Sequence, residues 1–299
     1  MILITGANGH IGRRLISALL PSARVRALVR SERAAASLAD TGAEVRIVDY
    51  LDTRAMTASA QGCSHAVHLV GVIKESSTTT FEAAHEATTR VLAAAAADAS
   101  LRRIVYLSIL GAHVGSGNAC LASKARAEHL LAEGAVPSLV IRVPMVLGEG
   151  DHASRALFHR ARRRVDFQFR AGSFEQPIYA GDVVAALRSS IGDGDDLPAA
   201  MALDLAGPES LTRAELTRRA ARTMDVRGPV TISLPVSVGM FVAALLERLS
   251  DDPPLSRAML GVLDHDDHID PSPALSALSL SLTPLDQALH RCLVENPPI

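Results

Sequence analysis

A glycine-rich segment near the N-terminus has the residue types and the spacing that bind a dinucleotide. Residues 5–12 read TGANGHIG, directly after an apolar run and at the start of an amphipathic one. Glycines in this context permit a tight turn, close approach of backbone N–H groups to a pyrophosphate, and close packing of helix on strand. We favour this interpretation over a glycine-rich turn without a ligand. The predicted cofactor-binding residues of this loop are Gly6, Asn8, Gly9, His10, Ile11 and Gly12.

The end of the second apolar run bears on which nicotinamide dinucleotide is bound. A site for NADH places an acidic residue there for the ribose 2′-hydroxyl, whereas this chain has Arg30, followed by Ser31 and Arg33. A guanidinium offers a fork of N–H donors that suits a 2′-phosphate. In an Arg-rich chain the alternative, a solvated charge, stays open. The position favours NADPH as the cofactor, with NADH as the second choice.

Composition excludes several classes of function. The 299 residues carry 30 basic and 32 acidic side chains, a net charge of −2, so electrostatic binding to nucleic acid is not expected. Three cysteines, Cys63, Cys120 and Cys292, lie far apart in no metal-ligand or redox spacing, which favours a reducing, cytoplasmic setting. The chain begins without a secretory leader pattern. Its most apolar later stretch, 236–246, is about half the length of a membrane span, so we expect a buried helix there.

Strand and helix patterns alternate through the first half of the chain. Such alternation predicts a Rossmann-type α/β fold, a doubly wound parallel sheet whose strand C-termini share one edge. The predicted strands are 2–5, 25–29, 45–48, 66–70, 104–107 and 139–143, and the predicted helices are 11–20, 31–40, 81–97 and 123–133.

The rhythm changes after Gly148. An Arg-rich helical pattern over 153–170 precedes a short strand at 202–205 and a helix that Ser210 or Thr212 can cap, with Glu215 placed for a capping box. We therefore predict a dinucleotide-binding domain over 1–150, also using 175–206. Residues 151–174 and 207–299 form a smaller, mainly helical C-terminal cap that binds substrate.

A family resemblance rests on motifs that occur in a fixed order. After TGANGHIG come VRALVR, HLVGVI, YLSILGA, ASKARAE, RVPMVLG, QPIYAGDVVAAL and LAGPESLTRAEL. Together they resemble the atypical short-chain dehydrogenases/reductases of the extended type. Within these, the chain is similar to the NAD(P)-binding group that includes the 39 kDa accessory subunit of respiratory complex I, and to ketoreductases of angucyclinone antibiotic biosynthesis. The resemblance implies a nicotinamide cofactor along the sheet edge. It places Asp49 and Tyr50 near the adenine, Val70 and Gly71 near the adenosine ribose, and Pro144 and Val146 against the nicotinamide.

The chain departs from this family at the catalytic motif. Catalytic members carry Tyr-x-x-x-Lys on the helix after the fifth strand, with Tyr as the proton donor and Lys on the nicotinamide ribose. Here the segment reads Cys120-Leu-Ala-Ser-Lys124, so Lys124 is kept and the tyrosine is absent. A thiol one turn before an ammonium could have a lowered pKa and be reactive. We instead expect Cys120 to pack, because its side chain is too short to place sulfur where the phenol oxygen would be.

Other polar groups near the predicted nicotinamide site are weaker candidates. Ser108 ends the fifth strand, and it either takes the family's serine role or satisfies the strand end. His113, Ser116 and Asn118 follow on the next loop, where each could hydrogen-bond a ketone oxygen, although an ordinary loop role is favoured for each. The predicted catalytic set is therefore Lys124, Ser108 and His113.

Two charged clusters are assigned no chemistry. The acidic and histidine-containing run at 264–270 is expected to be a solvated loop, and no metal site is predicted. The arginines at 160 and 162–164 are expected to form an exposed helix face.

These features favour an NADPH-dependent ketoreductase that acts on an apolar small molecule. Without the tyrosine, the proton must come from a substrate hydroxyl, water, Lys124 or His113. A substrate with its own phenol or enol beside the ketone demands least of the protein, so an aromatic polyketide such as an angucyclinone is the substrate hypothesis. The alternative is a non-catalytic NAD(P)H-binding structural subunit or redox sensor. No nucleic-acid or membrane partner is expected, and a homo-oligomer is left open.

Overall fold

A seven-stranded sheet forms the centre of the first of two units. The computed structural model describes residues 1–192, 198–250, 253–262 and 266–298. The strand order is β11-β6-β5-β4-β1-β2-β3, and the pairings from β3 through β5 are parallel. The strands are β1 (Ile2–Thr5), β2 (Val25–Val29), β3 (Glu44–Ile47), β4 (His65–His68), β5 (Arg103–Ile109), β6 (Ser138–Val143) and β11 (Ala200–Asp204).

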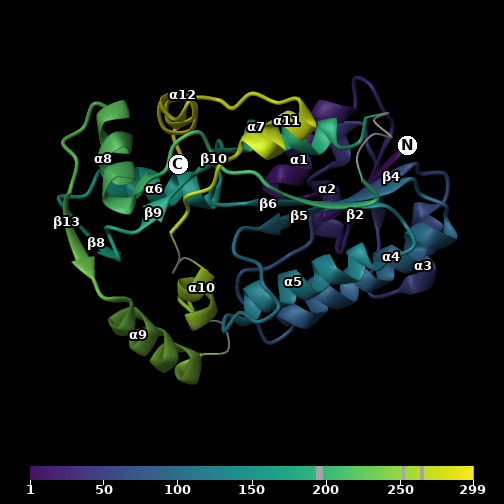
Figure 1. Ribbon diagram of the computed structural model, residues 1–299, viewed down its shortest axis with the longest axis horizontal. Helices are drawn as coiled ribbons and strands as arrows, with labels where there is room; N and C mark the ends of the chain where they lie inside the picture. The colour runs from purple at the N-terminus through teal and green to yellow at the C-terminus, as the bar shows by residue number, and fades with distance from the viewer. Residues whose placement is uncertain (193–197, 251–252, 263–265, 299) are drawn as a thin grey trace. The chain divides into compact units, whose positions relative to one another are not determined.

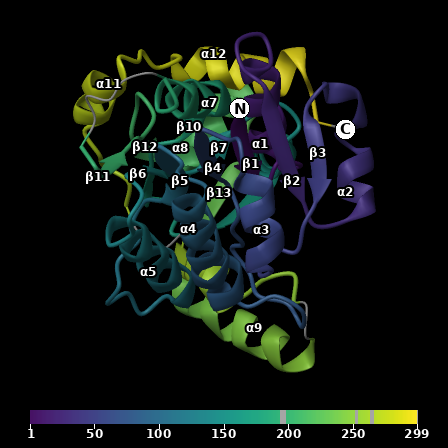
Figure 2. The ribbon, with the colours of Figure 1, turned by 90° about the vertical axis from the view of Figure 1, so that its right-hand side faces the viewer.

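Helices cover both faces of this sheet. One face carries α3 (Thr53–Ala60), α4 (Thr88–Asp98) and α5 (Ala119–Ala132), which lie side by side, and the other carries α1 (His10–Leu19) and α7 (Ala180–Ser189) (Figures 1 and 2). The short helix α2 spans Glu32–Ala36. Every residue of β1, β2 and β4 is buried, as expected for strands covered by helices on both faces. The predicted doubly wound α/β fold is therefore confirmed.

The strand order places a topological switch point beside β1. The chain moves from β1 to β2 on one side and returns to β4 on the other, so the crossover loops diverge at the C-terminal ends of β1 and β4. Ligands of open α/β sheets bind in the crevice that this divergence creates. The predicted glycine loop follows β1 directly, so it lies at this crevice.

Helix α3 was missing from the sequence-based prediction. Its eight residues, TRAMTASA, contain few large apolar side chains and no clear 3.6-residue stripe. Asp52 starts the helix, because its carboxylate accepts a hydrogen bond from the N–H of Ala55 at 3.0 Å. Tertiary contacts supply the rest, since Met56 and Ala60 are buried in the same core as Leu92 of α4.

The second unit comprises residues 143–182, 204–275 and 280–299. The first unit comprises residues 1–142, 183–203 and 276–279. The core of the second unit joins α6 (His152–Ala161), α8 (Arg213–Thr223) and α12 (Leu285–His290), through Leu157, Leu216 and Leu289. The functional domain boundaries given by the sequence, at 150, 175, 206 and 207, remain a prediction. The remaining elements of this unit are β7 (Val146–Leu147), β8 (Val165–Phe169), β9 (Phe174–Glu175), β10 (Ile178–Tyr179), β12 (Leu211–Thr212), β13 (Val230–Leu234), α9 (Val236–Leu249) and α10 (Arg257–Val262). The helix α11 (Ser272–Leu278) crosses from the second unit into the first.

The capping prediction for α8 is confirmed, and the choice between its two candidates is resolved. Thr212 Oγ1 accepts a hydrogen bond from the N–H of Glu215 at 3.2 Å. The hydroxyl of Ser210 instead donates to the carbonyl of Asp267 at 2.6 Å. Thr212 is therefore the N-cap, and the helix ends at Thr223 as the pattern indicated.

The predicted Arg-rich helix over 153–170 is wrong in its second half. Helix α6 ends at Ala161, and β8 begins at Val165 and pairs in parallel with β13, which lies more than sixty residues later. A distant partner strand outweighs local helical tendency, and no local pattern reveals it. The arginines at 162–164 are exposed as expected, but they follow α6 and form no face of it, and Arg160 is half-buried against Asp166.

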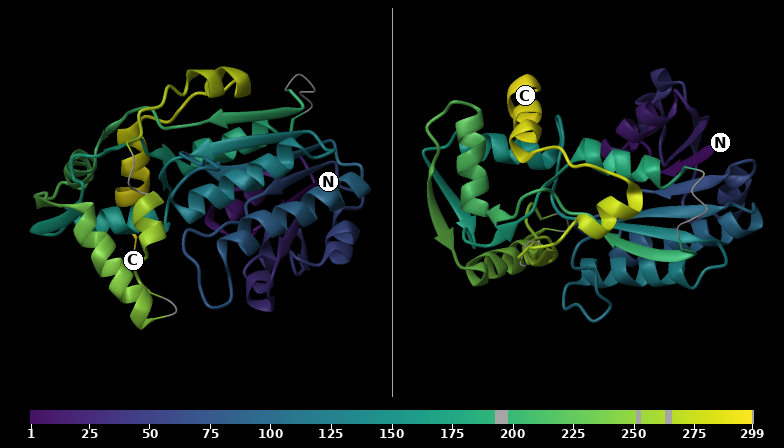
Figure 3. Two further views of the ribbon diagram at one scale, coloured as in Figure 1. Left: turned by 60° about the horizontal axis from the view of Figure 1, so that its bottom comes forward. Right: turned by 45° about the horizontal axis from the view of Figure 1, so that its top comes forward.

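The apolar stretch at 236–246 forms a helix, but the expectation that it is buried is wrong. Helix α9 buries only its small residues Gly239 and Ala243, and it packs beside α10 (Figure 3). Close packing through small residues leaves the large ones on the outer face. These exposed side chains are Val238, Phe241, Val242, Leu245 and Leu249. Within the described residues, no helix is long and apolar enough to cross a membrane.

Gln176 and Gly207 hold together three segments of the second unit. The side-chain amide of Gln176 donates to the carbonyls of Gly207 and Ile269, at 2.8 and 2.9 Å, and its Oε1 accepts from the N–H of Ile269 at 2.8 Å. A Cβ added to Gly207 would lie 1.9 Å from the carbonyl oxygen of Pro177. The backbone at Gly207 therefore lies so close to the backbone at Pro177 that no residue with a Cβ fits at position 207.

Substitution of Gly207 should therefore destabilise the second unit. We expect Gly207→Ala to lower the free energy of unfolding by at least about 2 kcal/mol in urea denaturation, because backbone must move to relieve the clash. Gly172→Ala is the matched control, since a Cβ there meets no atom within 4 Å. Equal stability of the two variants would contradict the packing argument.

Candidate functional site

The glycine loop has the geometry of a phosphate cradle. Gly6 has a φ of +69°, which glycine adopts without strain. A Cβ on Gly12 would lie 2.5 Å from the carbonyl oxygen of Ala7, so only glycine lets α1 begin this close to the loop. At Gly9, the N-cap, no side chain accepts from the first turn of α1. These features fit a pyrophosphate, which would accept from the first N–H groups of the helix.

Tyr50 ties the glycine loop to the end of β2. Its hydroxyl donates to the carbonyl of Leu28 at 2.6 Å and accepts from the N–H of Gly6 at 2.9 Å. Burial raises the pKa of Tyr50 to about 12, against a smaller lowering by the nearby Arg30 guanidinium. The phenol therefore keeps its proton, which it donates to Leu28 at the end of β2, next to Arg30 in the sequence.

The predicted 2′-phosphate residues surround the start of α2. Arg30, Ser31 and Arg33 are exposed, and Ser31 is the N-cap of α2, with Oγ accepting from the N–H of Ala34 at 3.3 Å. Ser31 therefore has a structural role whether or not it also contacts a ligand. Asp49 is exposed as well, and its carboxylate accepts from the N–H of Leu51 at 3.0 Å.

The end of β4 lies against the same loop. A Cβ on Gly6 would come within 3.0 to 3.2 Å of the backbone of Leu69 and Val70, so these two segments are in direct contact. A Cβ on Gly71 would lie 2.8 Å from Nζ of Lys124. The structure thus brings Gly6, Val70, Gly71 and Lys124 together at one edge of the sheet.

Lys124 is buried at this edge, with 8% of its surface exposed. Its ammonium donates to the carbonyls of Leu107 and Val70, at 3.2 and 3.5 Å, and lies 4.5 Å from the centre of the Tyr106 ring. Burial lowers the pKa of Lys124 to about 8, so the group is mainly charged at neutral pH. Since an ammonium has three N–H donors, one remains for a hydroxyl such as that of a ribose.

Cys120, at the position of the missing tyrosine, is an inert thiol. Its Sγ donates to the carbonyl of Val72 at 3.5 Å. Burial raises the pKa of Cys120 to about 11, and the opposing effect of Lys124 is smaller. Desolvation outweighs the neighbouring charge, which favours the packing role expected for Cys120 over a reactive thiolate.

Two buried histidines at this edge were missed by the sequence analysis. The ring of His85 bonds the backbone of Val72 through Nε2, which lies 3.1 Å from its nitrogen and 3.0 Å from its oxygen. His68 Nδ1 lies 2.6 Å from Thr5 Oγ1, and its ring stacks on Tyr106. Burial lowers the pKa of each histidine to about 3, so both rings are neutral at physiological pH. Of these three side chains, only Lys124 is charged.

A signal for His85 was present in the sequence. His85 lies at the i+4 position from Phe81, on the stripe that continues through Thr88 and Leu92 and is buried in the structure. A polar ring on an otherwise buried face needs a partner inside the protein. The turn at Glu82–Ala87 is a π-helix, which widens the helix where His85 reaches the strand end.

Ser108 points to an ion pair between α5 and β6. Its hydroxyl donates to Glu128, whose carboxylate also accepts from Arg142 at 2.5 to 3.2 Å. A hydroxyl has one proton to donate, so Ser108 cannot also donate to a ketone while this bond stands. The catalytic role assigned to Ser108 remains a prediction.

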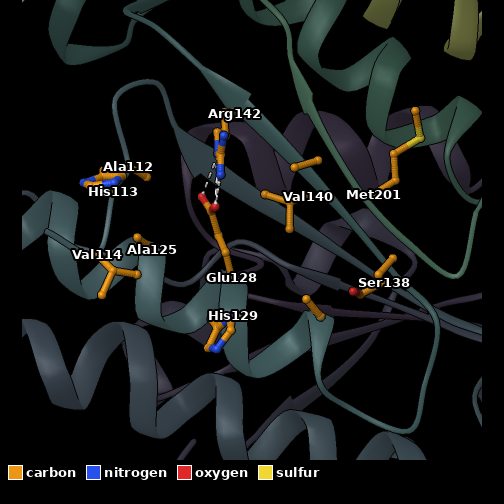
Figure 4. A pocket seen from close by; sticks show the side chains of 13 residues that line it. Ala112, His113, Val114, Ala125, Glu128, His129, Ser138, Val140, Arg142 and Met201 are labelled. Atoms are coloured by element: carbon orange, nitrogen blue, oxygen red, sulfur yellow. Dashed lines mark hydrogen bonds and ion pairs between the residues drawn. The ribbon is translucent and has the colours of Figure 1, made fainter.

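Glu128 and Arg142 also line a cavity of about 340 Å³. In Figure 4 their side chains point toward each other, and His113 stands apart from them on the loop after β5. Nδ1 of His113 accepts from the N–H of Gly115 at 3.2 Å, so its proton is on Nε2. Asn118 caps α5 by accepting from Cys120 and Leu121, which is the ordinary role expected for it.

The remaining predicted residues belong to the second unit. Pro144 follows β6, and Val146 begins β7 and pairs with Ile178. Their contact with nicotinamide remains a prediction. In the acidic tail run at 264–270, positions 264 and 265 lie outside the described residues. Asp266 is used structurally, accepting from Ser173 Oγ at 2.5 Å and from the N–H of Phe174 at 2.8 Å.

Lys124 should give the protein a distinctive pH dependence. Its pKa is lowered from 10.5 to about 8 on folding, so between these values the unfolded chain binds more protons and the stability of the native state rises with pH. We expect the free energy of unfolding of the wild type, minus that of Lys124→Met, to increase between about pH 8 and about pH 10. The variant should also bind NAD(P)H more weakly.

Urea denaturation at several pH values measures this difference. Lys74→Met is the matched control, since it removes the other lysine of the chain. A difference between wild type and Lys124→Met that stays constant with pH would contradict the burial of a charged ammonium.

Comparison with known proteins agrees with this geometry. A family model described as NAD(P)H-binding matches residues 6–166, more than half of the chain. Ceramide reductase of Caulobacter vibrioides is 32% identical over 164 residues, which cover 54% of this chain and 51% of the relative. A 4-hydroxy-2-methyl-3-oxo-4-farnesyl-3,4-dihydroquinoline-1-oxide ketoreductase of Stigmatella aurantiaca is 30% identical over 172 residues, 50% of this chain and 51% of the relative. The chain thus matches about half the length of these curated relatives.

Solved structures show the same fold over the whole chain. The crystal structure of gox2253 has a TM-score of 0.76 at 19% identity, covering 100% of this chain and 99% of that one. The NADPH complex of the quinone oxidoreductase QOR2 from Escherichia coli has a TM-score of 0.74 at 21% identity, covering 97% and 99%. With the glycine loop at the switch point and the family match across it, the chain belongs to the NAD(P)H-binding family and has NAD(P)H as its cofactor.

Proposed function

We propose that this protein is an NADPH-dependent ketoreductase of an apolar small molecule. The observation that carries the proposal is the buried ammonium of Lys124, held beside the glycine loop with a donor left for a ribose hydroxyl. Two relatives are named as a reductase and a ketoreductase, and a neighbour in fold as a quinone oxidoreductase. These names support reduction as the class of reaction.

NADPH is favoured over NADH by the exposed Arg30. Arg30 directly follows β2, and Tyr50 joins the end of this strand to the glycine loop through its bonds with Leu28 and Gly6. Arg30 is therefore at the edge where the adenosine end of the cofactor is expected. An NADH site would gain nothing from a guanidinium there and would need a carboxylate.

The reduction transfers a hydride to the carbonyl carbon, and the resulting alkoxide takes up one proton. The bound nicotinamide supplies the hydride. Cys120 is a poor acid, because its pKa is about 11 and its proton is directed to Val72. Ser108 directs its proton to Glu128. The remaining donors are Lys124, the Nε2 proton of His113, water, and a hydroxyl on the substrate.

A substrate hydroxyl beside the ketone makes the smallest demand on the protein. It can donate to the alkoxide within one molecule, so no side chain has to be placed for that step. Such an arrangement of phenol and ketone is typical of aromatic polyketides. We therefore propose an aromatic polyketide of the angucyclinone type as substrate, in antibiotic biosynthesis such as that of simocyclinone.

One observation favours a second candidate, a non-catalytic NAD(P)H-binding subunit or redox sensor. The position of the family's acid holds a thiol that is protonated and bonded to backbone. A protein that only binds the dinucleotide would also keep the glycine loop and Lys124.

A substrate panel separates the two candidates. Purified protein is mixed with NADPH and polycyclic hydroxyketones, and the loss of NADPH absorbance is followed. We expect consumption with a ketone that has a neighbouring phenol, slower consumption with its O-methyl ether, and little effect of Cys120→Ala. Tight NADPH binding without turnover across the panel would favour the binding protein instead.

The preference for NADPH gives a separate prediction. We expect Arg30→Ala to weaken NADPH binding by about tenfold or more, as expected for loss of a charged hydrogen bond, and to leave NADH binding unchanged. Calorimetry with each dinucleotide measures both affinities. Arg24→Ala is the matched control, because Arg24 precedes β2 at the opposite end of the strand and is also exposed. An equal loss for both dinucleotides would count against a 2′-phosphate contact.

A further inference from the structure

Strand β8 of the second unit has an inverted pattern of burial. Its polar residues Asp166 and Gln168 are 1% and 2% exposed, whereas Val165 and Phe167 are 42% and 61% exposed. Burying polar groups while exposing apolar ones is unfavourable unless the polar side has partners. The inverted strand therefore indicates that its polar side faces something other than a hydrophobic core.

The polar side of β8 lines a cavity of about 260 Å³ within the second unit. Phe169, Val236 and Leu260 line it together with Asp166 and Gln168. Ligand sites usually measure about 300–1,000 Å³, so this cavity fits one end of a substrate. An apolar wall with a few polar groups is the usual composition of a small-molecule site.

The hydrogen bonds within the cavity leave acceptors without donors. Nε2 of Gln168 donates to Asp166 Oδ2 at 2.6 Å and to Thr217 Oγ1 at 2.8 Å. Because a carboxylate only accepts, the nitrogen end of the amide must face Asp166, which fixes the orientation of Gln168. Among the described residues, Gln168 Oε1 is buried without a hydrogen-bond donor, and Asp166 Oδ1 has only the ion pair with Nη1 of Arg163 at 3.9 Å, which is too long for a hydrogen bond. The missing partner is therefore an O–H or N–H group.

The cations of the cavity are already paired. Nε of Arg213 lies 2.8 Å from Glu175, with both side chains 9% exposed, and Nη1 of Arg213 donates to the carbonyl of Phe169. Nε of Arg160 donates to Asp166 at 3.1 Å. An anionic ligand such as a nucleoside diphosphate would have to compete with buried carboxylates for these guanidinium groups. A neutral hydrogen-bond donor needs no such exchange.

The cavity is connected by sequence to the predicted reaction centre. Met145 lines it, and Met145 lies between Pro144 and Val146, the residues expected against the nicotinamide. An occupant of the cavity would thus be next to the segment that meets the reacting end of the cofactor.

We infer that this cavity recognises a hydroxyl-bearing aromatic ring of the substrate. Gln168 Oε1 accepts the hydroxyl proton, while Phe169 and Leu260 contact the ring. The inference rests on the proposed function, since it names the chemistry by which the same site selects its substrate. It adds a specificity-determining residue, Gln168, in the second unit.

Helix α9 contributes to the shape of the cavity through Gly239. A Cβ there would lie 2.8 Å from the Phe169 ring and 3.1 Å from Leu260, two residues of the cavity wall. A larger residue at 239 must push this wall inward. Gly239→Val therefore narrows the cavity and leaves the polar groups of β8 unchanged.

The test compares two ligands that differ by one hydrogen-bond donor. The NADP⁺-loaded protein is titrated with 2-naphthol and with 2-methoxynaphthalene, and each dissociation constant is measured by ligand-observed NMR. We expect wild type to bind 2-naphthol about tenfold more tightly, the cost of leaving a buried acceptor unpaired. Gln168→Met should remove this preference. Gly239→Val should weaken the binding of both ligands.

Gln287→Met, an exposed glutamine of the same unit, is the matched control and should keep the preference. Equal affinity of wild type for the two ligands would overturn the inference without any variant. A folded Gln168→Met variant that still binds 2-naphthol more tightly than 2-methoxynaphthalene would also overturn the inference. So would a wild type that shows no such preference and from which uridine diphosphate displaces 2-naphthol. Because binding is measured without turnover, failure of the ketoreductase assay with the preference intact would reject the reaction and not the subsite.

Discussion

The burial of one ammonium group organises the ligand-binding edge of the sheet. Lys124 reaches under Gly71 to the carbonyls at the ends of β4 and β5 and lies on the face of Tyr106. Removing a charge from water is costly, and the pKa of about 8 records that cost. Carbonyl oxygens and an aromatic face compensate part of this cost. The site therefore keeps a cation available to a ligand.

The neighbours of this cation follow from the same constraint. His68 and His85 have pKa values lowered to about 3, so they fill the space around Lys124 with polar but neutral rings. Cys120 keeps its proton for the same reason, since burial outweighs the attraction of the ammonium. A reaction in this site thus has one positive group and no anionic base among these neighbours. Such a site suits the orientation of a cofactor and the stabilisation of negative charge on a carbonyl oxygen better than the removal of a proton.

The parts of the fold that could be predicted are those with a local physical signal. Apolar runs between amphipathic segments predicted the strands. The motif TGANGHIG predicted the turn after β1, and its last glycine is required because a Cβ at Gly12 would clash with the backbone of Ala7. Thr212 was recognisable as a cap from its spacing to Glu215. By contrast, β8 depends on pairing with β13, and the burial of Asp166 and Gln168 reverses the usual pattern. The burial of His85 could be predicted from its place on the stripe of Phe81 and Leu92, whereas the widened helical turn around it has no local signal in the sequence.

The two units leave different polar groups for a ligand, and this difference bears on how substrate is chosen. At the sheet edge, Lys124 donates to two carbonyls, and the Tyr50 hydroxyl both donates and accepts. On β8, the Gln168 amide uses its donors on Asp166 and Thr217 and keeps a buried acceptor in reserve. The remaining N–H donor of Lys124 suits a ribose hydroxyl, a group of the cofactor that many reductases share. A buried acceptor that lacks a donor instead penalises every ligand without a hydroxyl or amine at that point, because desolvation then goes uncompensated. Selectivity in the proposed reaction would therefore come from the second unit, through a strand whose burial pattern the local sequence did not predict.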